Sequence, residues 1–543
     1  MRTRIALRDP REAGADDRFG RAGDDPPERE AAGGSGRRQI GQFWMKRLWR
    51  QKLGGTTSKS RRESGATLTG RHAFQSHHAT LRRDWIAVPY RSPIRLAVAL
   101  ATLGCVAAPA AHASWTVPQA ITDPAAANVH AAGNDRGSEA FAWKVTSRRF
   151  VSLRSQSGLA SSVRARIRLP DGRLGRVQTI SSTREIVANP QIGVADSGDA
   201  TAVWTQAGRH LRIMAAFRPH GGRFGTPFEL GRSTHFTDAK PQLVVGRLGD
   251  AVVAWNQGRH VEVVRRAANA VCVPRRARDC FRAPLSLRAG TDQTVALGPL
   301  GSAYVAWAAD VRGGGELHTR LRMAVIRRSG RLTGDHAISR AADGDASQPS
   351  IAVRRDATAD LAWRASLPAG GEQNDAAPIL AAVSTPVEVT SQPRAVSLLR
   401  GERPTVRVDA QGEAVLAWDQ FDSTPQNPDG SEIAVAVRPA GADTFGPAAT
   451  ITPANVTASG SSLAVDATGS AYLVYSAFGG DLSTPGASPL GLSHVRPAGG
   501  AFGPPLALPD GFGGATVFSA GAKVTAVSGG GSAGRWLVSD WTP

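Results

Sequence analysis

The sequence predicts an all-β protein, a seven- or eight-bladed β-propeller, and three observations support this fold. A phrase with two short strands around a polar turn recurs at a spacing of about fifty to sixty residues. The second strand of that phrase is apolar at nearly every position. The two ends of the repeated region also carry complementary parts of one unit. Eight units are counted, and the degeneracy of the first and last units could reduce that number to seven.

The recurring phrase ends in an aromatic residue and is typified by RPTVRVDAQGEAVLAWDQ, from Arg403 to Gln420. Related text includes NPQIGVADSGDATAVWTQ, KPQLVVGRLGDAVVAWNQ and QPSIAVRRDATADLAWRA. Most units continue into a third strand, such as IAVAVRPAG, and a fourth, such as FGPAATI. Four short strands joined by glycine-containing turns predict one antiparallel sheet. The anchoring aromatic residues are Trp143, Trp204, Trp255, Trp307, Trp363, Trp418 and Tyr475.

The second strands distinguish a propeller from a two-layer sandwich. ATAVW, AVVAW, AYVAW and AVLAW are apolar throughout, so each strand must be covered on both faces. A sandwich leaves the outer face of each sheet in water, and its strands would alternate between apolar and polar residues. Sheets stacked around an axis fit better, and the small Ala before most of the aromatic rings allows close packing between them.

The two ends of the repeated region predict how the ring closes. The last unit runs ATVFSAGAKVTAVS and GRWLVSDWTP and has no fourth strand, whereas SWTVPQAIT at Ser114 to Thr122 resembles a fourth strand without a unit. We expect this segment to complete the last sheet and remove its exposed edge.

On these residues the chain resembles the secreted bacterial proteins built from WD40-like or YVTN-like propeller repeats. The resemblance covers residues 114–543 and depends on phrases such as PSIAV and VDATGSAYLVY. It implies that the first strand of each unit is innermost. It transfers no active residue, because one propeller fold serves binding in most proteins and catalysis in a few.

The N-terminal region predicts export. Residues 1–90 have no sustained periodicity and are expected to be a disordered basic leader, so the true start codon is open. Residues 91–113 resemble a signal peptide, with Arg91 and Arg95 before an apolar run and Ala111-His112-Ala113 as the cleavage site. An apolar core segment and lipoprotein anchoring at Cys105 are the alternatives. We expect no transmembrane segment in the mature chain.

The net charge of +20 does not by itself predict nucleic-acid binding. Residues 1–113 hold 21 Lys/Arg and 10 Asp/Glu, a charge of +11, which leaves only +9 for the rest of the chain. No pattern of aromatic and basic residues typical of nucleic-acid binding accompanies this charge. We therefore expect a protein, peptide or glycan partner and a monomer.

Two cysteines remain after the predicted cleavage, Cys272 and Cys280 in CVPRRARDC. In an exported protein this pair predicts a local disulfide, with two free thiols as the alternative. Two cysteines without a neighbouring histidine do not make a zinc site, and we expect no metal or cofactor.

Candidate binding residues lie in loops that should share one face of the ring, namely those entering the first strands and those following the anchoring aromatics. Arg209/His210 and Arg259/His260 occupy equivalent positions in TQAGRHL and NQGRHV, where they form either an anion patch or a shared turn. Asp238 and Arg403 come from polar entering loops.

No catalytic motif is recognised, so no catalytic residue is assigned. The mature chain has only Tyr304, Tyr472 and Tyr475 as sialidase-type nucleophiles, all within apolar strands, and GGSAG has no helix after it to make a serine-hydrolase elbow. The sequence thus favours a binding or structural module of the cell envelope or exterior over an enzyme. The alternative is a glycan-processing hydrolase or lyase whose carboxylates and an arginine converge at the axial mouth.

Overall fold

The second strands are buried on both faces, as the sequence predicts. Every residue of β8 (Ala200–Ala207) is buried, and in β12 (Ala251–Gln257) only the last residue is exposed. Six tryptophans and a tyrosine at the strand ends have no solvent-exposed surface. These are Trp143, Trp204, Trp255, Trp307, Trp363, Trp418 and Tyr475.

The computed structural model describes residues 113–153, 157–234, 239–268, 270, 272, 274–313, 316–366, 377–421, 430–453, 456–479, 490–509, 511–530 and 534–543. The predicted leader, nearly all of the predicted signal peptide including Cys105, and Asp238 lie outside these residues. No helix in the described ranges is long and apolar enough to cross a membrane.

Several four-stranded antiparallel sheets follow one another along the chain. One contains β3 (Ala126–Gly133), β4 (Glu139–Ser152), β5 (Ser157–Arg168) and β6 (Gln178–Thr179), and the next contains β7 (Ile186–Val194), β8, β9 (Leu211–Arg218) and β10 (Phe228–Ser233). A third contains β18 (Asp345–Val353), β19 (Ala359–Ser366), β20 (Ile379–Ser384) and β21 (Val389–Ser397). A fourth contains β22 (Arg400–Val408), β23 (Ala414–Phe421), β24 (Ser431–Arg438) and β25 (Ala449–Thr450), and a fifth contains β26 (Val456–Val465), β27 (Ala471–Gly479), β28 (Leu490–Arg496) and β29 (Leu506–Ala507).

Two predicted units are joined in a seven-stranded sheet. It contains β11 (Gln242–Val245), β12, β13 (His260–Arg266), β14 (Leu285–Leu297), β15 (Ala303–Gly313), β16 (Glu316–Ile326) and β17 (Leu332–Ala337). The first part of β14 pairs with β13 and the second part with β15, so one strand serves as the last of one unit and the first of the next. Short 3₁₀ helices, η1 (Pro274–Cys280) and η2 (Ala341–Asp343), lie before β14 and β18.

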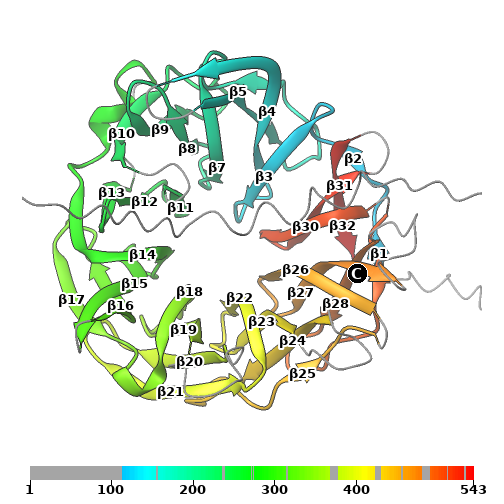
Figure 1. The fold of residues 1–543 in the computed structure, drawn as a ribbon. Coiled ribbons are helices and arrows are strands. Elements are labelled where there is room, and N and C mark those ends of the chain that lie inside the picture. Colours follow the sequence, from blue (N-terminus) through cyan, green and yellow to red (C-terminus); the bar gives the residue numbers. More distant parts are fainter. Residues whose placement is uncertain are drawn as a thin grey trace, which may run out of the picture. The chain divides into compact units, whose positions relative to one another are not determined.

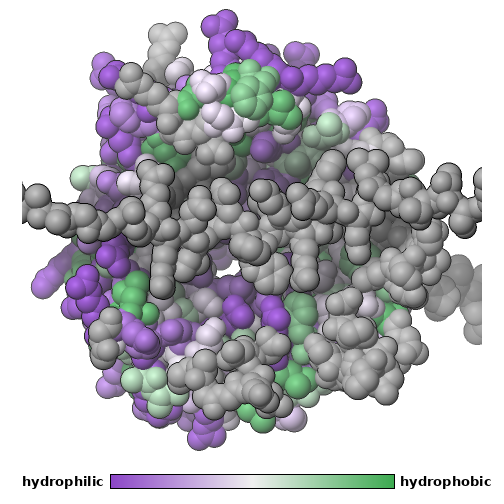
Figure 2. All heavy atoms as spheres, in the orientation of Figure 1, coloured by the Kyte–Doolittle hydropathy of each residue, from purple (hydrophilic) through white to green (hydrophobic). Residues whose placement is uncertain are grey.

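The innermost strands contact one another in order along the chain. Contacts run from β3 to β7, β11, β14, β18, β22, β26 and β30 (Gly511–Ala520), and β30 contacts β3 again. The first strands therefore form a closed, propeller-like series within residues 104–543, with β3 to β30 facing its middle (Figure 1). Hydrophilic side chains cover most of the coloured surface in Figure 2, and hydrophobic ones occur in scattered groups.

The predicted closing segment pairs with the last sheet. β1 (Ser114–Trp115) and β2 (Gln119–Ala120) both pair with β32 (Arg535–Thr542), which lies beside β31 (Lys523–Gly530). Ser114 lies opposite Thr542, so segments from the two ends of the repeated region form one sheet.

Charged side chains hold this last sheet against the first. Arg168 of β5 donates to both carboxylate oxygens of Asp540 at 2.7 and 2.8 Å. Lys523 of β31 pairs with Glu139 of β4 at 2.7 Å, and Glu139 is completely buried. Reciprocal ion pairs across the junction therefore supplement its apolar contacts.

Each innermost strand except β11 contains a β-bulge at the same position. The bulge places one residue in the left-handed region, with φ of about 50° to 54° for the non-glycine members. These residues are Asn128, Asn189, Asp292, Gln348, Arg403, Gly460 and Gly514. Because the conformation is costly for most side chains, repetition of the bulge indicates that contacts with the next sheet hold it.

Side chains two residues after the bulge join neighbouring innermost strands. The Ser350 Oγ accepts from the Val406 backbone N–H at 3.0 Å, and the Ser462 Oγ accepts from the N–H of Val517 at 3.1 Å. In the first sheet the His130 Nδ1 accepts from the Ile192 N–H at 3.2 Å. A neutral imidazole thus replaces a hydroxyl in the same contact.

The closing segment yields a stability prediction. Deletion of residues 114–122 removes Trp115 and Ile121 from the core, where 7% and 0% of their surfaces are exposed. Burial of each side chain contributes about 1.5–3 kcal/mol, so the free energy of unfolding should fall by about 3–6 kcal/mol. Denaturant titration followed by tryptophan fluorescence measures this change. An unchanged midpoint would contradict the role of the segment in closing the series.

His130 yields a pH prediction. Burial lowers the pKa of its imidazole from the ordinary 6.5 to about 4. The unfolded chain therefore binds a proton near pH 6.5 that the folded chain does not, and this contribution to stability is lost as the pH falls from about 6.5 to about 4. The resulting loss in the free energy of unfolding is at most about 3 kcal/mol. Water reaches part of the His130 surface and weakens the effect of burial. In the His130→Asn variant the free energy of unfolding should fall less between pH 7 and pH 4.5 than in the wild-type protein. Urea unfolding at pH 7, 5.5 and 4.5 measures this difference. Equal falls in the two proteins would refute the prediction.

Candidate functional site

The candidate residues of the β8–β9 and β12–β13 turns lie at equivalent positions of neighbouring sheets. Arg209 and His210 are exposed, while Arg259 Nη2 pairs with Asp310 Oδ2 at 3.4 Å. The His260 Nδ1 lies 3.4 Å from the Leu287 carbonyl oxygen. Among the described residues, no hydrogen bond or ion pair joins the two Arg-His pairs.

Arg403, another candidate, occupies the bulge of β22 with φ 54°. Its N–H donates to the Gln348 Oε1 at 2.6 Å, and its guanidinium pairs with buried Asp419. Asp419 also accepts from the N–H of Gly460 at 2.8 Å. Arg403 thus belongs to a network that fixes the bulges of three sheets.

A large cavity lies at the opposite ends of the innermost strands. Its volume is 1320 Å³, and it is lined by the turns between first and second strands from β3–β4 to β18–β19. This cavity was not predicted from the sequence. Six of its lining residues are arginines and three are aspartates, namely Arg136, Arg247, Arg266, Arg328, Arg354 and Arg355 with Asp196, Asp199 and Asp250.

Three of the turns that line this cavity begin with a small residue. In other sheets the first turn residue is Asn134, Asp409 or Asp466, whose Oδ1 accepts an N–H four residues later at 2.8–3.0 Å. Ala195, Gly246 and Gly298 take the same position around the cavity and open the same backbone turn. NDRGS, DAQGE and DATGS differ at this position from ADSGD, GRLGD and GPLGS, but the NDRGS turn also lines the cavity through Arg136, so this contrast alone does not locate it.

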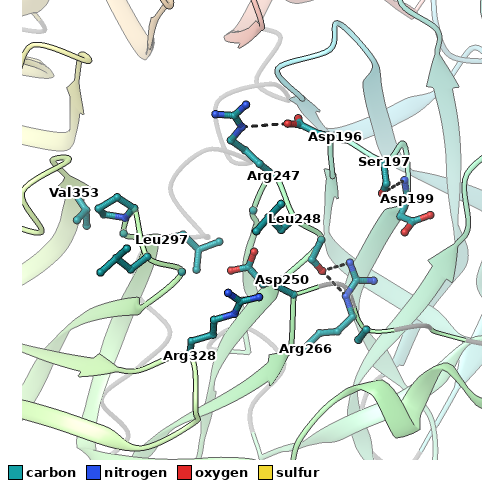
Figure 3. A pocket seen from close by; sticks show the side chains of 18 of the residues that line it. Asp196, Ser197, Asp199, Arg247, Leu248, Asp250, Arg266, Leu297, Arg328 and Val353 are labelled. Carbon is teal, nitrogen blue, oxygen red and sulfur yellow. Dashed lines mark hydrogen bonds and ion pairs between the residues drawn. The ribbon is translucent and has the colours of Figure 1, made fainter.

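Arg266 is a buried cation on the cavity wall, with 2% of its surface exposed (Figure 3). Its Nε and Nη2 donate to the Gly249 carbonyl oxygen, and its guanidinium lies 4.9 Å from the centre of the Phe217 ring. Its Nη1 has no hydrogen-bond partner. Burial lowers the pKa of the guanidinium to about 10, partly opposed by Asp199 and Asp250, so it is charged at neutral pH.

Asp250 supplies a buried acceptor in the same cavity. The residue is 5% exposed, and its Oδ2 accepts no hydrogen bond. The Arg265 Nη2 lies 3.7 Å from this oxygen. Burial lowers the pKa of Arg265; Asp250 opposes that shift, while Arg282 and Arg328 add to it. Cations are therefore crowded near a single carboxylate.

The cavity rim is also basic. Arg247 Nε lies 2.7 Å from Asp135 Oδ2 and 3.1 Å from Asp196 Oδ2. Within the described ranges, no ion pair involves Arg136, Arg328 or Arg355, and all three are exposed. Two exposed leucines, Leu248 and Leu300, lie among these arginines. The arrangement suits an anion that also has an apolar face.

The segment between β13 and β14 forms one wall. Ala268, Ala270 and Cys272 line the cavity, and Cys272 is joined to Cys280 by the predicted disulfide, with the two Cα atoms 5.8 Å apart. Cys272 packs with Phe217, the ring beneath Arg266. The disulfide thus supports the side of the cavity next to the buried cation.

No group of three or more His, Cys, Asp or Glu side chains is placed to hold a metal within the described part of the chain.

No protein-family model matches the chain, and no curated protein matches it in sequence. Among solved structures, a PL25 ulvan lyase has 10% identity and a TM-score of 0.40, covering 65% of this chain and 93% of its own. A protein of unknown function from Dyadobacter fermentans DSM 18053 has 10% identity and a TM-score of 0.36, covering 79% and 98%. The α-L-arabinanase of Penicillium chrysogenum has 10% identity and a TM-score of 0.35, covering 55% and 92%. Likeness at this level carries no inference about chemistry.

The disulfide yields a prediction for this wall. Without reductant, native protein should give no maleimide adduct at Cys272 or Cys280, and both should react after reduction. Replacing both cysteines by serine should lower the free energy of unfolding by about 2–3 kcal/mol, because a closed loop restricts the unfolded chain. Mass spectrometry and denaturant titration measure these effects, and labelling of Cys272 without reductant would contradict the pairing.

Proposed function

We propose that the protein is an exported binding protein that holds an acidic glycan in the arginine-lined cavity. The observation that carries this proposal is the buried guanidinium of Arg266, whose Nη1 has no partner inside the protein. A buried charge without a full set of partners is unfavourable, so a ligand anion at this position gains more than one at an exposed arginine.

The charge balance of the lining residues favours an anion. Each aspartate of the lining already has a partner or a neighbouring cation: Asp196 pairs with Arg247, Asp199 accepts from the His220 N–H at 2.8 Å, and Asp250 lies near Arg265. Arg136, Arg328 and Arg355 of the rim form no ion pair within the described ranges. A carboxylate or sulfate group would compensate them with charge-assisted hydrogen bonds.

Two further features favour a glycan. The Asp250 Oδ2 needs a hydrogen-bond donor, which a sugar hydroxyl supplies, and Leu248 and Leu300 offer apolar contact to the C–H face of a sugar ring. Single-stranded nucleic acids bind proteins largely by stacking on exposed aromatic side chains. The one aromatic residue of this lining, Phe217, is buried.

A glycan-processing hydrolase or lyase is the second candidate. Carboxylates and arginines from several sheets line the cavity. From the sequence, this combination is expected of a glycan-processing enzyme. Asp250, buried with an oxygen that accepts no hydrogen bond, would be its acid or base.

The finer features of the fold belong to the same proposal. We count eight blades, with β14 shared by two of them, and regard the repeats as WD40-like or YVTN-like. Arrangement of the repeats around a closed ring supports this count. The disulfide between Cys272 and Cys280 supports the proposal of export, because such bonds persist in oxidising compartments. We propose a monomer of the cell envelope or exterior.

The test is a binding titration with dextran sulfate, polygalacturonate and uncharged dextran. Arg328→Gln should weaken binding of the two acidic polymers by about tenfold, since a charged hydrogen bond contributes about 1.5 kcal/mol or more. Arg327→Gln is the matched control, because Arg327 is the preceding residue, is also exposed and does not line the cavity. Isothermal titration calorimetry measures the affinities.

Failure of both acidic polymers to bind, or equal losses in the two variants, would overturn the proposal. Equally tight binding of single-stranded DNA would replace the glycan by a nucleic acid. Release of new reducing ends or unsaturated sugars, lost in Asp250→Asn, would establish the enzyme in place of the binding protein.

A further inference from the structure

We propose that a second anion subsite, beside the arginine-lined cavity on the same face, makes the ligand an extended polyanionic chain. It rests on the proposed function, because both subsites hold the same glycan. The second subsite is a cavity of 370 Å³ between the outer strands of the first two sheets. Its walls are the end of β5 with the segment before β6, and the end of β9 with the loop that follows.

The lining of this smaller cavity carries positive charge only. Four of its residues are arginines, namely Arg166, Arg176, Arg218 and Arg223, and none is an aspartate or glutamate. Arg176 and Arg223 are exposed and take part in no ion pair within the described ranges. An anion that enters is therefore not repelled by a lining carboxylate.

Backbone carbonyl groups hold the other two arginines in place. The Arg166 Nε donates to the Gly175 carbonyl at 2.7 Å, and the Arg218 Nη1 donates to that of Gly198 at 3.1 Å. Burial lowers the pKa of both guanidinium groups, with Asp123 and Asp199 respectively opposing the shift. A neutral carbonyl fixes the side chain without cancelling its charge, so donors remain for a ligand anion.

One glutamine fixes the separation of the two walls. The Gln178 Nε2 donates to the Phe224 carbonyl oxygen at 2.7 Å, and its Oε1 accepts from the Phe224 N–H at 2.9 Å. This two-point contact joins the first sheet to the loop of the second. The subsite is thus formed before a ligand arrives, which lowers the entropic cost of binding.

Residues 217–221 contribute to both cavities, with Phe217 lining the larger one and Arg218 the smaller one. Pro219 lines the larger cavity and Gly221 lines the smaller one. Between them, the His220 N–H donates to Asp199 Oδ1, and Asp199 lines the larger cavity. Because successive side chains of a strand point to opposite faces of its sheet, β9 lies between the two cavities, and a ligand chain that occupies both must cross the loop after β9.

This arrangement predicts that affinity depends on ligand length. Occupation of the second subsite by a tethered group is intramolecular, so a chain that spans both sites binds more tightly than one confined to the larger cavity. Oligomers too short to reach Arg176 and Arg223 should bind with an affinity that depends on these side chains only weakly, through the net charge of the protein.

The experiment compares a ladder of oligogalacturonates with polygalacturonate, at constant salt, by isothermal titration calorimetry. The variant is Arg176→Gln/Arg223→Gln, and its matched control is Arg148→Gln/Arg184→Gln, which removes two exposed arginines that line neither cavity. Wild-type affinity should rise with length, and the variant should lose about tenfold or more for long chains only. Thermal unfolding of both double variants verifies that they are folded.

Three results would overturn the second subsite while leaving the first cavity in place. In the first, the wild-type affinity does not depend on ligand length. In the second, the variant and the control lose the same affinity. In the third, the variant loses the same affinity for short and for long chains. If no oligomer or polymer binds the wild-type protein, the proposed function itself fails.

Discussion

The structure depends on one packing constraint, which is that every sheet is covered on both faces by sheets of the same kind. The bulky indoles of Trp204, Trp255 and Trp418 have no exposed surface, and an alanine four residues earlier leaves room on the same strand. Where a ring comes closest to the next sheet, even a methyl group would collide. Gly231 lies against the Trp255 ring in this way, and any larger residue would force the sheets apart.

Apolar packing restricts which residues the strands can contain, whereas the turns tolerate many different residues. Asp360 is a polar group in the interior that is fully paired, because it accepts from both Arg354 and Arg438 and joins two neighbouring sheets. In contrast, the turns can change without disturbing the strands. The first turn residue is Asn134 in one sheet and Ala195, Gly246 or Gly298 in others, while the backbone turn stays the same. The candidate site thus lies in turns whose residues vary on a repeated framework.

The strands were predictable because their signal is local. ATAVW shows burial on both faces by composition alone, and SWTVPQAIT was recognised as the partner of β32 because it repeats a fourth-strand phrase. Union of two units through β14 was not predicted, since LSLRAGTDQTVAL contains no signal that distinguishes one long strand from two short ones. The cavity was missed for a different reason. Arg266 reads as the end of an ordinary strand, and only its approach to Gly249 and Phe217 reveals a buried charge.

The last sheet has a consequence for the order of folding. It contains Ser114–Trp115 and Arg535–Thr542, so its strands come from positions more than four hundred residues apart. Contacts of such high sequence separation form late, because a long loop must close first. During synthesis β1 and β2 must therefore wait, with their backbone edges unpaired, until β32 is made. A chain that stalls in this state would present those edges to other copies, which favours aggregation at this stage.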